Sequence, residues 1–460
     1  AAASDEVFDI EQVGATNIVG TGTTESCTDA ALDTALAAGG LVTFNCGGPA
    51  TIDISKGTGT KTIAADTMID GGGQITISGG DTIAVFLVNP GATFTLSNLT
   101  IAHAEGIANN GTLNVTNCSF NNNKTASAIG SAGSLTVIGS VFTSNQSGAI
   151  YCDKGTALVA NTTFAGNHSG SGGAVYNFSA AVTVAGSTFV NNHAVGTAFV
   201  PGFGGAIFND IGSTSVTNST FKGNVADANG GGGAITSGGC CSGGGAVTVT
   251  NCTFTGNLGG MGGGVHNNRG SIVLRNSIVA SVPASSCAGV VTDGGSNLDD
   301  GTSCAFSSAN ASLSNTDPQL DPAGLQLNGG PTKTVRLCAA AGTPAGCTAA
   351  SPAIDAGDPS VCAGDAVNNV DQRGFPRPSI GHAQCSIGAY EADPSSQQMC
   401  VGDCSGMSIV AINDLITLVN IALGNTQLAA CEHGVAAGVE VDVALIIHAV
   451  NNALNGCGPQ

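Results

Sequence analysis

Residues 161–167, NTTFAGN, decide the fold, because five other segments of the chain repeat their pattern. Each copy places an asparagine three residues after a phenylalanine, and successive phenylalanines lie 22, 22, 25, 32 and 33 residues apart. Self-similarity at such a period is the signature of a repeat architecture. Aliphatic residues at Ile77, Ile101 and Val279 extend the series in both directions. The other five copies are NCSFNNN (117–123), GSVFTSN (139–145), GSTFVNN (186–192), NSTFKGN (218–224) and NCTFTGN (251–257).

A second motif repeats in step with the first. It consists of an aliphatic residue followed two positions later by a small polar residue or a cysteine. Short alternating segments such as LTV (135–137) and VTV (182–184) separate the two motifs, and alternation over so few residues predicts strands bounded by turns. The aliphatic positions are Ile107, Ile129, Ile150, Val175, Ile207, Ile235 and Val265, and the residues two positions later are Asn109, Ser131, Cys152, Asn177, Asn209, Ser237 and Asn267.

Strands at a constant offset in every repeat can pair with their copies only if the chain winds as a solenoid. Each coil then adds one rung, about 4.8 Å along the axis. The sequence therefore predicts a mainly β fold, a right-handed parallel β-helix, with ladders of stacked phenylalanine and asparagine side chains. The Phe ladder is expected at Phe120, Phe142, Phe164, Phe189, Phe221 and Phe254, and the Asn ladder at Asn123, Asn145, Asn167, Asn192, Asn224 and Asn257.

Four segments are expected along the chain. Residues 1–47 form an N-terminal strand and a helical cap, in which Thr28 is the N-cap of a short helix. Residues 48–282 form the coils of the β-helix, and residues 283–395 complete its C-terminal end with longer loops. Residues 396–460 form a small helical module.

Composition and charge exclude several classes of partner. The chain has 31 acidic and 11 basic residues, and a net charge of −20 lacks the basic surface that nucleic acids require. No run of 18 apolar residues occurs, so we expect no membrane span. The sequence begins Ala1-Ala2-Ala3, as expected of a mature secreted protein from which a signal peptide has been removed.

Seventeen cysteines, many in local pairs, favour an oxidising, extracellular setting. Zinc is the alternative for Cys400 and Cys404, but a second pair with the usual spacing is missing. Cys118 and Cys252 precede ladder phenylalanines and are expected as buried thiols, whereas the pairing of Cys240 and Cys241 stays open. The expected local pairs are Cys27 with Cys46, Cys287 with Cys304, Cys338 with Cys347 and Cys362 with Cys385, and a set of four contains Cys400, Cys404, Cys431 and Cys457.

The second half of the chain resembles a known family. The motifs are NLDDGTSC (297–304), TDPQLDPAGLQLNGGPTKTVRL (316–337), SPAIDAGD (351–358), DQRGFPRP (371–378) and CSIGAYEAD (385–393). In this order they resemble the choice-of-anchor Q proteins, which are secreted bacterial β-helix proteins, and the resemblance covers residues 20–395. It implies an extracellular or cell-surface protein with an exchangeable C-terminal anchor and no defined catalytic activity.

The anchor position is occupied by two related segments, which share Val-Asn-x-Ala-Leu at 419–423 and 450–454. They resemble a dockerin, a pair of EF-hand-like units. This resemblance implies that Asp403, Ser405, the carbonyl of Ile409 and Asp414 are candidate calcium ligands, but Met407 stands where an oxygen ligand is needed. In the second copy the ligand set is essentially lost. We therefore expect disulfides to replace calcium, with residual calcium at the first loop as the alternative.

Catalysis is not expected. Polysaccharide lyases need a base beside a carboxylate cluster, and the basic residues of the coils are scattered. Glycoside hydrolases need two carboxylates across one groove, yet residues 106–292 contain only Asp153, Asp210 and Asp227. His168 and His193 lie one coil apart, and we interpret them as exposed turn residues rather than metal ligands. The basic residues of the coils are Lys124, Lys154, Lys222, Arg269 and Arg275.

A non-catalytic structural or adhesive protein is the favoured function, and a carbohydrate-binding or polysaccharide-degrading protein is the alternative. Glycan binding needs exposed aromatic residues, and the chain has no tryptophan and only Tyr151, Tyr176 and Tyr390. Self-association is expected through strand addition by residues 7–13, VFDIEQV, and through the C-terminal module. Arg373 is expected to close the C-terminal end of the coils by pairing with nearby acidic residues, which are Asp355, Asp371 and Glu391.

Overall fold

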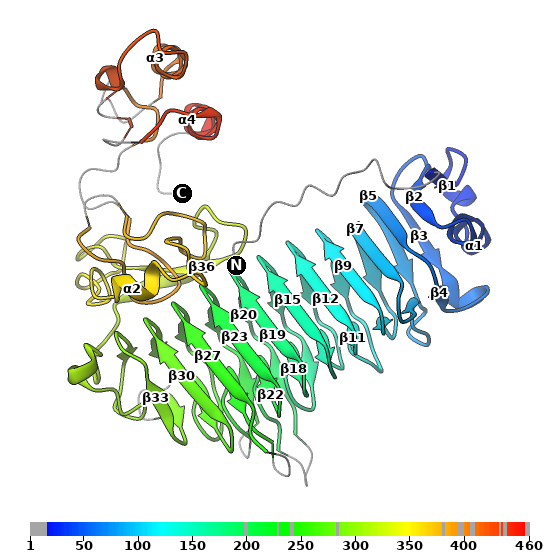
Figure 1. The fold of residues 1–460 in the computed structure, drawn as a ribbon, viewed down its shortest axis with the longest axis horizontal. Coiled ribbons are helices and arrows are strands. Elements are labelled where there is room, and N and C mark those ends of the chain that lie inside the picture. The colour runs from blue at the N-terminus through cyan, green and yellow to red at the C-terminus, as the bar shows by residue number, and fades with distance from the viewer. Residues whose placement is uncertain are drawn as a thin grey trace.

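Short strands joined by tight turns make up most of the molecule, as the repeats predict. The computed structural model describes residues 16–196, 201–227, 230–239, 243–281, 285–379, 382–393, 400–404, 410–431, 434–435 and 439–455. Within these ranges the fold is mainly β, with parallel sheets of 21 and 10 strands and four short α-helices. The mainly β, parallel character expected from the sequence is therefore confirmed, and the arrangement is consistent with a coiled stack (Figure 1).

Each repeat contributes strands to three columns, and each strand pairs in parallel with its copy in the next repeat. We call the strands of one repeat a rung. Column 1 holds β9 (Thr112–Thr116), β12 (Ser134–Ile138), β15 (Thr156–Ala160), β19 (Ala181–Ala185), β23 (Ser213–Thr217), β27 (Ala246–Thr250), β30 (Ser271–Arg275) and β33 (Val291–Asp293). Column 2 holds β10 (Ser119–Asn121), β13 (Val141–Thr143), β16 (Thr163–Ala165), β20 (Thr188–Val190), β24 (Thr220–Lys222), β28 (Thr253–Thr255), β31 (Ile278–Ala280) and β34 (Leu298–Asp299).

Columns 1 and 2 merge at the N-terminal end into longer strands, and column 3 forms the separate ten-stranded sheet. Strands β5 (Thr67–Ser78) and β7 (Thr93–Ala102) span both columns, whereas β1 (Thr16–Val19) and β2 (Gly40–Phe44) extend column 1 and β3 (Ala50–Asp53) extends column 2. Column 3 holds β4 (Lys61–Ile63), β6 (Phe86–Val88), β8 (Ile107–Asn109), β11 (Ile129–Ser131), β14 (Ile150–Cys152), β18 (Val175–Asn177), β22 (Ile207–Asn209), β26 (Ile235–Ser237), β29 (Val265–Asn267) and β32 (Cys287–Ala288). Smaller sheets pair β17 (His168–Ser169), β21 (His193–Ala194) and β25 (Val225–Ala226), and β35 (Leu320–Gln326) with β36 (Thr334–Leu337).

A residue with positive φ allows the sharp turn between columns 1 and 2. It lies three residues before each ladder phenylalanine and is always asparagine or glycine, the two residues that tolerate this backbone conformation best. At Gly139 a β-carbon would lie only 2.6 Å from the Asn117 side chain of the previous rung. Asparagine and glycine therefore occur at this position because the turn requires a positive φ. These residues are Asn117, Gly139, Asn161, Gly186, Asn218, Asn251 and Asn276.

The paired rungs extend beyond the predicted range of 48–282. Strand β1 already pairs with β2, and β2 with β5, while β33 and β34 continue columns 1 and 2 as far as Asp299. Helix α1 (Asp29–Ala37) packs against β1 and β2, and the Thr28 hydroxyl accepts a hydrogen bond from the Ala31 N–H as its N-cap. The N-terminal segment is therefore both the cap and the first part of the sheet.

A buried lysine fastens α1 to the rest of this end. The Lys61 ammonium lies 2.5 Å from Asp29 Oδ1 and 2.7 Å from Asp33 Oδ1, and the lysine side chain is 3% exposed. Both carboxylates belong to α1, whereas Lys61 begins column 3. The pairing thus joins the cap helix to the first rung of the ten-stranded sheet.

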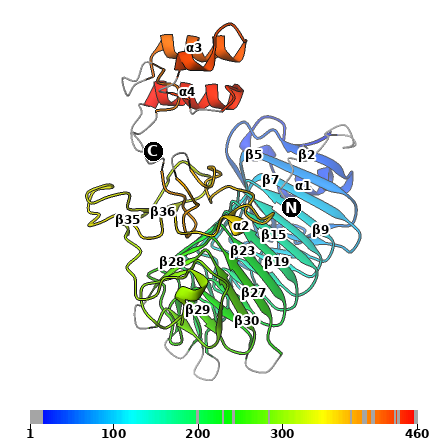
Figure 2. The ribbon, with the colours of Figure 1, turned by 60° about the vertical axis from the view of Figure 1, so that its left-hand side comes forward.

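Residues 316–393, which we call the strap, follow the last rung but do not close the end of the stack. The strap turns back and lies along the side of the rungs that contain Phe189, Phe221 and Phe254 (Figures 1 and 2). It contains β35, β36 and the short helix α2 (Pro359–Cys362). Residues 287–299 thus continue the rungs, as expected of the segment 283–395, whereas its later part, the strap, bonds through its polar groups to the outer surface of column 2.

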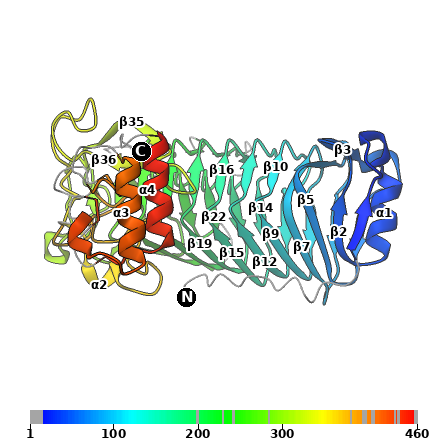
Figure 3. The same ribbon diagram turned by 90° about the horizontal axis from the view of Figure 1, so that it is seen from above.

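Two helices form the C-terminal module. Helix α3 (Ile412–Ala422) and helix α4 (Val443–Asn455) lie side by side (Figure 3). A small separate core joins them, built from Leu418, Ala449 and Cys431 with their neighbours. No described helix is long and apolar enough to cross a membrane.

Candidate functional site

The Phe ladder lies inside the stack in the register that the repeats indicate. Phe120, Phe142 and Phe164 are opposite one another in column 2, and all six ladder phenylalanines are fully buried. Neighbouring ring centroids are 4.6 to 5.0 Å apart, and the ring planes differ by no more than 14°. The ladder continues into Ile101 at one end and Val279 at the other.

The Asn ladder satisfies the turn after each column 2 strand. The Asn145 amide donates to Asn167 Oδ1 at 2.8 Å and to the Phe120 carbonyl at 3.0 Å, while its oxygen accepts from the Asn123 amide at 2.8 Å. The same pattern repeats up to Asn257. Because buried polar groups without partners are costly, each asparagine stabilises both its own turn and the next rung.

A hydroxyl ladder runs beside the phenylalanines. Its members lie two residues before each phenylalanine, and each side chain accepts a hydrogen bond from the backbone N–H one rung earlier, as Ser140 Oγ does from Cys118 at 3.1 Å. Cys118 and Cys252 occupy this same position, and their thiols donate to backbone carbonyls two residues before them at 3.3 Å. They are thus buried thiols, and burial raises the pKa of Cys118 to about 11 and of Cys252 to about 12.

Five disulfides lie among the described residues, which indicates an oxidising, extracellular setting. Four of them join Cys27 to Cys46, Cys287 to Cys304, Cys338 to Cys347 and Cys362 to Cys385, the local pairs expected from the sequence. The fifth joins Cys404 to Cys431, and Cys400 is also disulfide-bonded. Cys152 is a third buried free thiol, and Cys240, Cys241 and Cys457 lie outside the described residues.

A line of threonines on the outer side of column 2 holds the strap. Gln372 is central: its amide nitrogen donates to Thr188 Oγ1 at 3.0 Å, and its oxygen accepts from the Thr220 hydroxyl at 2.6 Å. Thr253 Oγ1 accepts from the Ala389 N–H at 3.0 Å. All three threonines are buried, whereas Val141, at the equivalent position of an uncovered rung, is 40% exposed.

Two arginines, Arg373 and Arg377, form ion pairs within the strap, and only Arg373 was predicted from the sequence to do so. Arg373 pairs with Asp371 at 2.8 Å, and its guanidinium lies 3.7 Å from the centre of the Tyr390 ring. Arg373 also donates to the backbone carbonyl of Glu391 at 2.9 Å, but it forms no ion pair with the carboxylates of Asp355 and Glu391. Asp355 instead pairs with His382 at 3.0 Å, and the Glu391 carboxylate faces Arg377.

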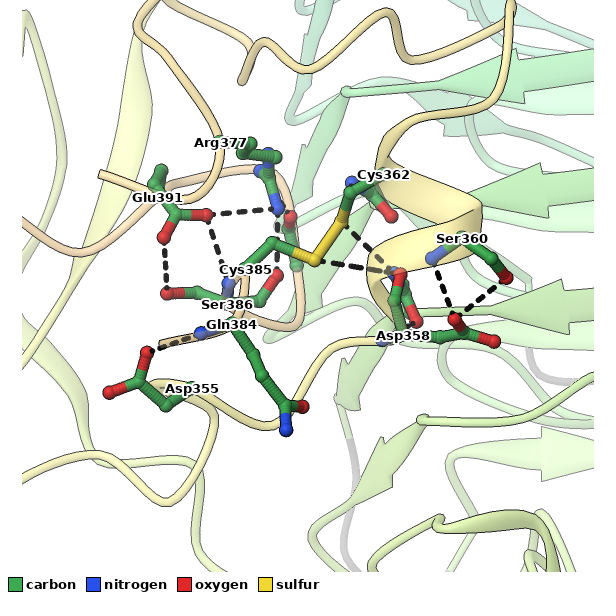
Figure 4. Close-up of a disulfide and its surroundings, with 12 residues drawn as sticks. Asp355, Asp358, Ser360, Cys362, Arg377, Gln384, Cys385, Ser386 and Glu391 are labelled. Carbon is green, nitrogen blue, oxygen red and sulfur yellow. Dashed lines mark hydrogen bonds and ion pairs between the residues drawn. A yellow bond between two sulfur atoms is a disulfide. The ribbon is translucent and has the colours of Figure 1, made fainter. Parts of the chain in front are cut away.

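Arg377 and Glu391 form a buried ion pair beside the Cys362–Cys385 disulfide (Figure 4). The charged atoms are 3.6 Å apart, and both side chains are fully buried. Arg377 also donates to the Ser386 and Gly388 carbonyls at 2.7 Å, and Glu391 accepts from the Ser386 N–H at 2.9 Å. Burial raises the pKa of Glu391, although Arg377 opposes this shift. The geometry is that of a structural pair that fixes the end of the strap.

Residues considered for catalysis are separated in the structure. Lys124 pairs with Asp81, Lys154 lies 4.0 Å from Asp153, and Lys222 is on column 2. Arg269 and Arg275 lie at either end of β30, on a different rung. His168 and His193 are neighbours in a small sheet, with ring centroids 5.6 Å apart, and His193 Nε2 is 2.9 Å from Asp227 Oδ1. No group of three His, Cys, Asp or Glu side chains that could hold a metal occurs within the described ranges.

The candidate calcium loop is described only in part. Asp414 Oδ2 accepts the Ala411 N–H at 2.8 Å, which is a helix-capping role at the start of α3. In the second copy the roles are exchanged: Asp442 Oδ1 accepts the Leu445 N–H at 2.8 Å, and Asp442 and Leu445 are the counterparts of Ala411 and Asp414. Asp403 is buried, and Ser405 and Ile409 lie outside the described residues. Both helices thus begin with a carboxylate cap, but the carboxylate occupies a different position in each copy.

Calcium removal is expected to leave the melting temperature of the C-terminal module nearly unchanged, whereas reduction of its disulfides is expected to lower it. A disulfide that closes a loop of this length contributes about 3 kcal/mol, because it restricts the unfolded chain. Calorimetry of the full chain with a chelator, with a reductant and with both measures the two effects. The Cys404→Ser/Cys431→Ser variant is the control for the reductant, and a large loss of stability with chelator alone would contradict the expectation.

Helices α3 and α4 each expose a stripe of large apolar side chains. In each helix the four residues are spaced i, i+4, i+7 and i+11, which places them on one face. Exposure reaches 76% at Ile412 and Leu454. Neither stripe contains a charged residue. Each residue of the α3 stripe has its counterpart 31 residues later in the α4 stripe. The α3 stripe is Ile412, Ile416, Val419 and Leu423, and the α4 stripe is Val443, Ile447, Val450 and Leu454.

The duplication of this module was predicted from the sequence, but the exposure of its apolar stripes was not. The i, i+4, i+7, i+11 spacing was visible, but such a pattern predicts a buried face in most helices. Here the buried positions are instead Leu418 and Ala449, on a different face of each helix. Each helix carries two sets of apolar residues, one on its buried face and one in its stripe. The presence of this second set was the signal that could have identified the stripes.

No protein-family model matches the chain, and neither the curated proteins nor the solved structures that were compared with it contain a match.

Proposed function

We propose that the chain is a non-catalytic extracellular structural protein, a right-handed parallel β-helix that associates with copies of itself through a dockerin-like C-terminal module. The interior supports a scaffold role, because it is filled by the Phe, Asn and hydroxyl ladders. The strap and the described disulfides add rigidity to the outside.

The exposed stripes of α3 and α4 are the observation that carries this proposal. Monomeric proteins rarely leave large contiguous apolar areas in water. The eight residues of the two stripes are 37 to 76% exposed, and apolar surface of this kind is typical of a protein interface. A module whose function was only to end the chain would not need such a surface.

A second copy of the chain is the partner that fits these stripes best. With a net charge of −20, two copies repel each other over most of their surface, whereas the stripes carry no charge. The two stripes also present the same order of side-chain positions, which suits a symmetric contact between identical surfaces. Helix α1 covers the first rung, so the described N-terminal end does not offer a comparable surface. Residues 7–13 lie outside the described residues, and strand addition by them stays a prediction.

Adding charge to both stripes is expected to abolish self-association. The variant Ile416→Glu/Ile447→Glu places a carboxylate at the middle of each stripe, and glutamate keeps a high helix propensity. Light scattering coupled to size-exclusion chromatography should show dimers or larger species for the unmodified chain and monomers for the variant.

A matched control adds the same charges to other exposed positions of the same helices. Asn413→Glu/Ala444→Glu does so one residue after the start of each stripe, outside the i, i+4, i+7, i+11 face. It should assemble like the unmodified chain. An unmodified chain that stays monomeric at high concentration, or a stripe variant that still assembles, would refute the proposal.

A further inference from the structure

Aromatic side chains gather on the outer side of column 3. Residues at the middle of these three-residue strands point away from the core, because side chains alternate along a strand. On three consecutive strands, β14, β18 and β22, these residues are Tyr151, Tyr176 and Phe208. The centroid of the Tyr176 ring is 5.2 Å from that of Tyr151 and 5.0 Å from that of Phe208. They form a continuous row along the axis of the stack.

The row is covered at one end and open at the other. Phe203, in the loop before β22, packs on Phe208 with ring centroids 5.4 Å apart, and Phe208 is only 4% exposed. Tyr151 and Tyr176 remain half-buried, with part of each ring accessible to solvent. Further along the column the outward positions are Thr236 and His266, both buried. The loop that contains Phe203 therefore forms a raised wall at one end of the two tyrosines.

Two carboxylates flank the tyrosines. Asp153 and Asp210 each follow the last residue of a column 3 strand, at the next outward position. The Tyr176 hydroxyl lies 3.5 Å from Asp210 Oδ2, and Asp210 Oδ1 accepts the Gly239 N–H at 3.0 Å. The pKa of Tyr151 is raised by burial and by the negative charges of Asp153 and Asp210. Two of the three acidic residues between positions 106 and 292 thus lie close to one phenol.

We propose that Tyr151, Tyr176 and Asp153 form a binding site for a neutral polysaccharide, with the buried Asp210 behind Tyr176. Aromatic faces pack against the C–H faces of sugar rings, and carboxylate oxygens accept hydrogen bonds from sugar hydroxyl groups. The combination of aromatic surface with a few polar groups is typical of ligand sites. A row that repeats from rung to rung suits a ligand that is itself a repeating chain.

The charge of the site selects against acidic polysaccharides. Lys154 lies 4.0 Å from Asp153, and it is the basic residue that pairs with either of these carboxylates in the described part of the chain. An anionic sugar would therefore meet two negative charges and one positive charge, on a chain whose net charge is −20. A neutral sugar chain avoids this repulsion and still offers the hydroxyl groups that the Asp153 carboxylate can bind.

Tyrosine fluorescence reports directly on this site. The chain has three tyrosines and no tryptophan, and Tyr390 is 1% exposed within the strap. Titration with soluble β-glucan, arabinoxylan and galactomannan should give a saturable change of fluorescence for at least one polymer. Polygalacturonate, the charged comparison, should give none. The proposal fails if no neutral polymer gives a saturable change, or if polygalacturonate binds as tightly as the neutral polymers.

Variants then locate the binding surface by affinity electrophoresis in gels that contain the polymer that binds. Tyr151→Ala/Tyr176→Ala should weaken binding at least tenfold. Tyr151→Ala alone, which keeps the contact between Tyr176 and Phe208, should weaken it at least threefold. The control is Leu87→Ala, which changes the equivalent outward position three strands earlier in the same column. Unchanged retardation of both tyrosine variants, or an equal loss with Leu87→Ala, would overturn the proposal.

Discussion

Phe164→Ala is expected to lower the free energy of unfolding by about 3 to 5 kcal/mol, the usual cost of removing a buried phenylalanine side chain. Phe164 lies between two stacked neighbours, with ring centroids 5.0 Å from Phe142 and 4.8 Å from Phe189. The backbone of adjacent rungs is held by parallel pairing and by the Asn ladder, so the stack cannot collapse into the cavity. Denaturant unfolding of the full chain measures the loss.

The control for this substitution is Val141→Ala on the neighbouring rung. Val141 lies beside Phe142 in sequence but points outward and is 40% exposed, so its truncation should cost less than about 0.5 kcal/mol. Equal unfolding free energies for Phe164→Ala and the unmodified chain would show that the Phe ladder does not support the stack.

Arg377→Ala is expected to destabilise the strap by about 3 to 5 kcal/mol, because it leaves the buried Glu391 carboxylate without its counter-charge. It also removes the donors to the Ser386 and Gly388 carbonyls. Amide hydrogen exchange should show faster exchange between residues 371 and 391, while the rungs that contain Phe120 and Phe142 keep their protection. Exchange that is unchanged in the strap would contradict the role given to this ion pair.

Two further variants separate the charge from the packing. Arg269→Ala removes an exposed arginine and should leave exchange in the strap unchanged. Arg377→Met/Glu391→Leu removes both buried charges together and should recover much of the stability that Arg377→Ala loses, because apolar side chains of similar volume often replace a buried ion pair without cost.

The repeats made the rungs predictable from sequence. Phe164 and Asn167 recur with their neighbours at fixed offsets, and only parallel pairing from one repeat to the next brings every copy into an equivalent position. The sequence also shows that Asn161 and its equivalents are always asparagine or glycine. The reason, a positive φ at each of these turns, is given only by the structure. Local cysteine spacing likewise indicated four pairs that the structure joins.

The strap was not predictable in the same way, because its contacts follow no repeat. Gln372 meets Thr188 and Thr220 across 184 and 152 residues of sequence, and a single sequence contains no signal for such a contact. Asp371 lies two residues before Arg373, whereas nothing near Arg377 in the sequence identifies Glu391 as its partner. Tyr151 and Tyr176 lie at equivalent positions of the second repeat motif, so their alignment was visible in the sequence, whereas Phe203 beside them comes from a loop between repeats and was not.

The strap also limits how this protein can change in length. Its polar groups bond to the outside of consecutive rungs, from Gly186 to Asn276, at spacings fixed by its own fold. An additional repeat between Phe189 and Phe254 would move Thr253 away from Ala389 while Thr188 stayed beside Gln372. An additional repeat between Phe120 and Phe164 would disturb none of these bonds. Growth or shortening by whole repeats is thus compatible with the uncovered half of the molecule, and the covered half has a fixed number of repeats.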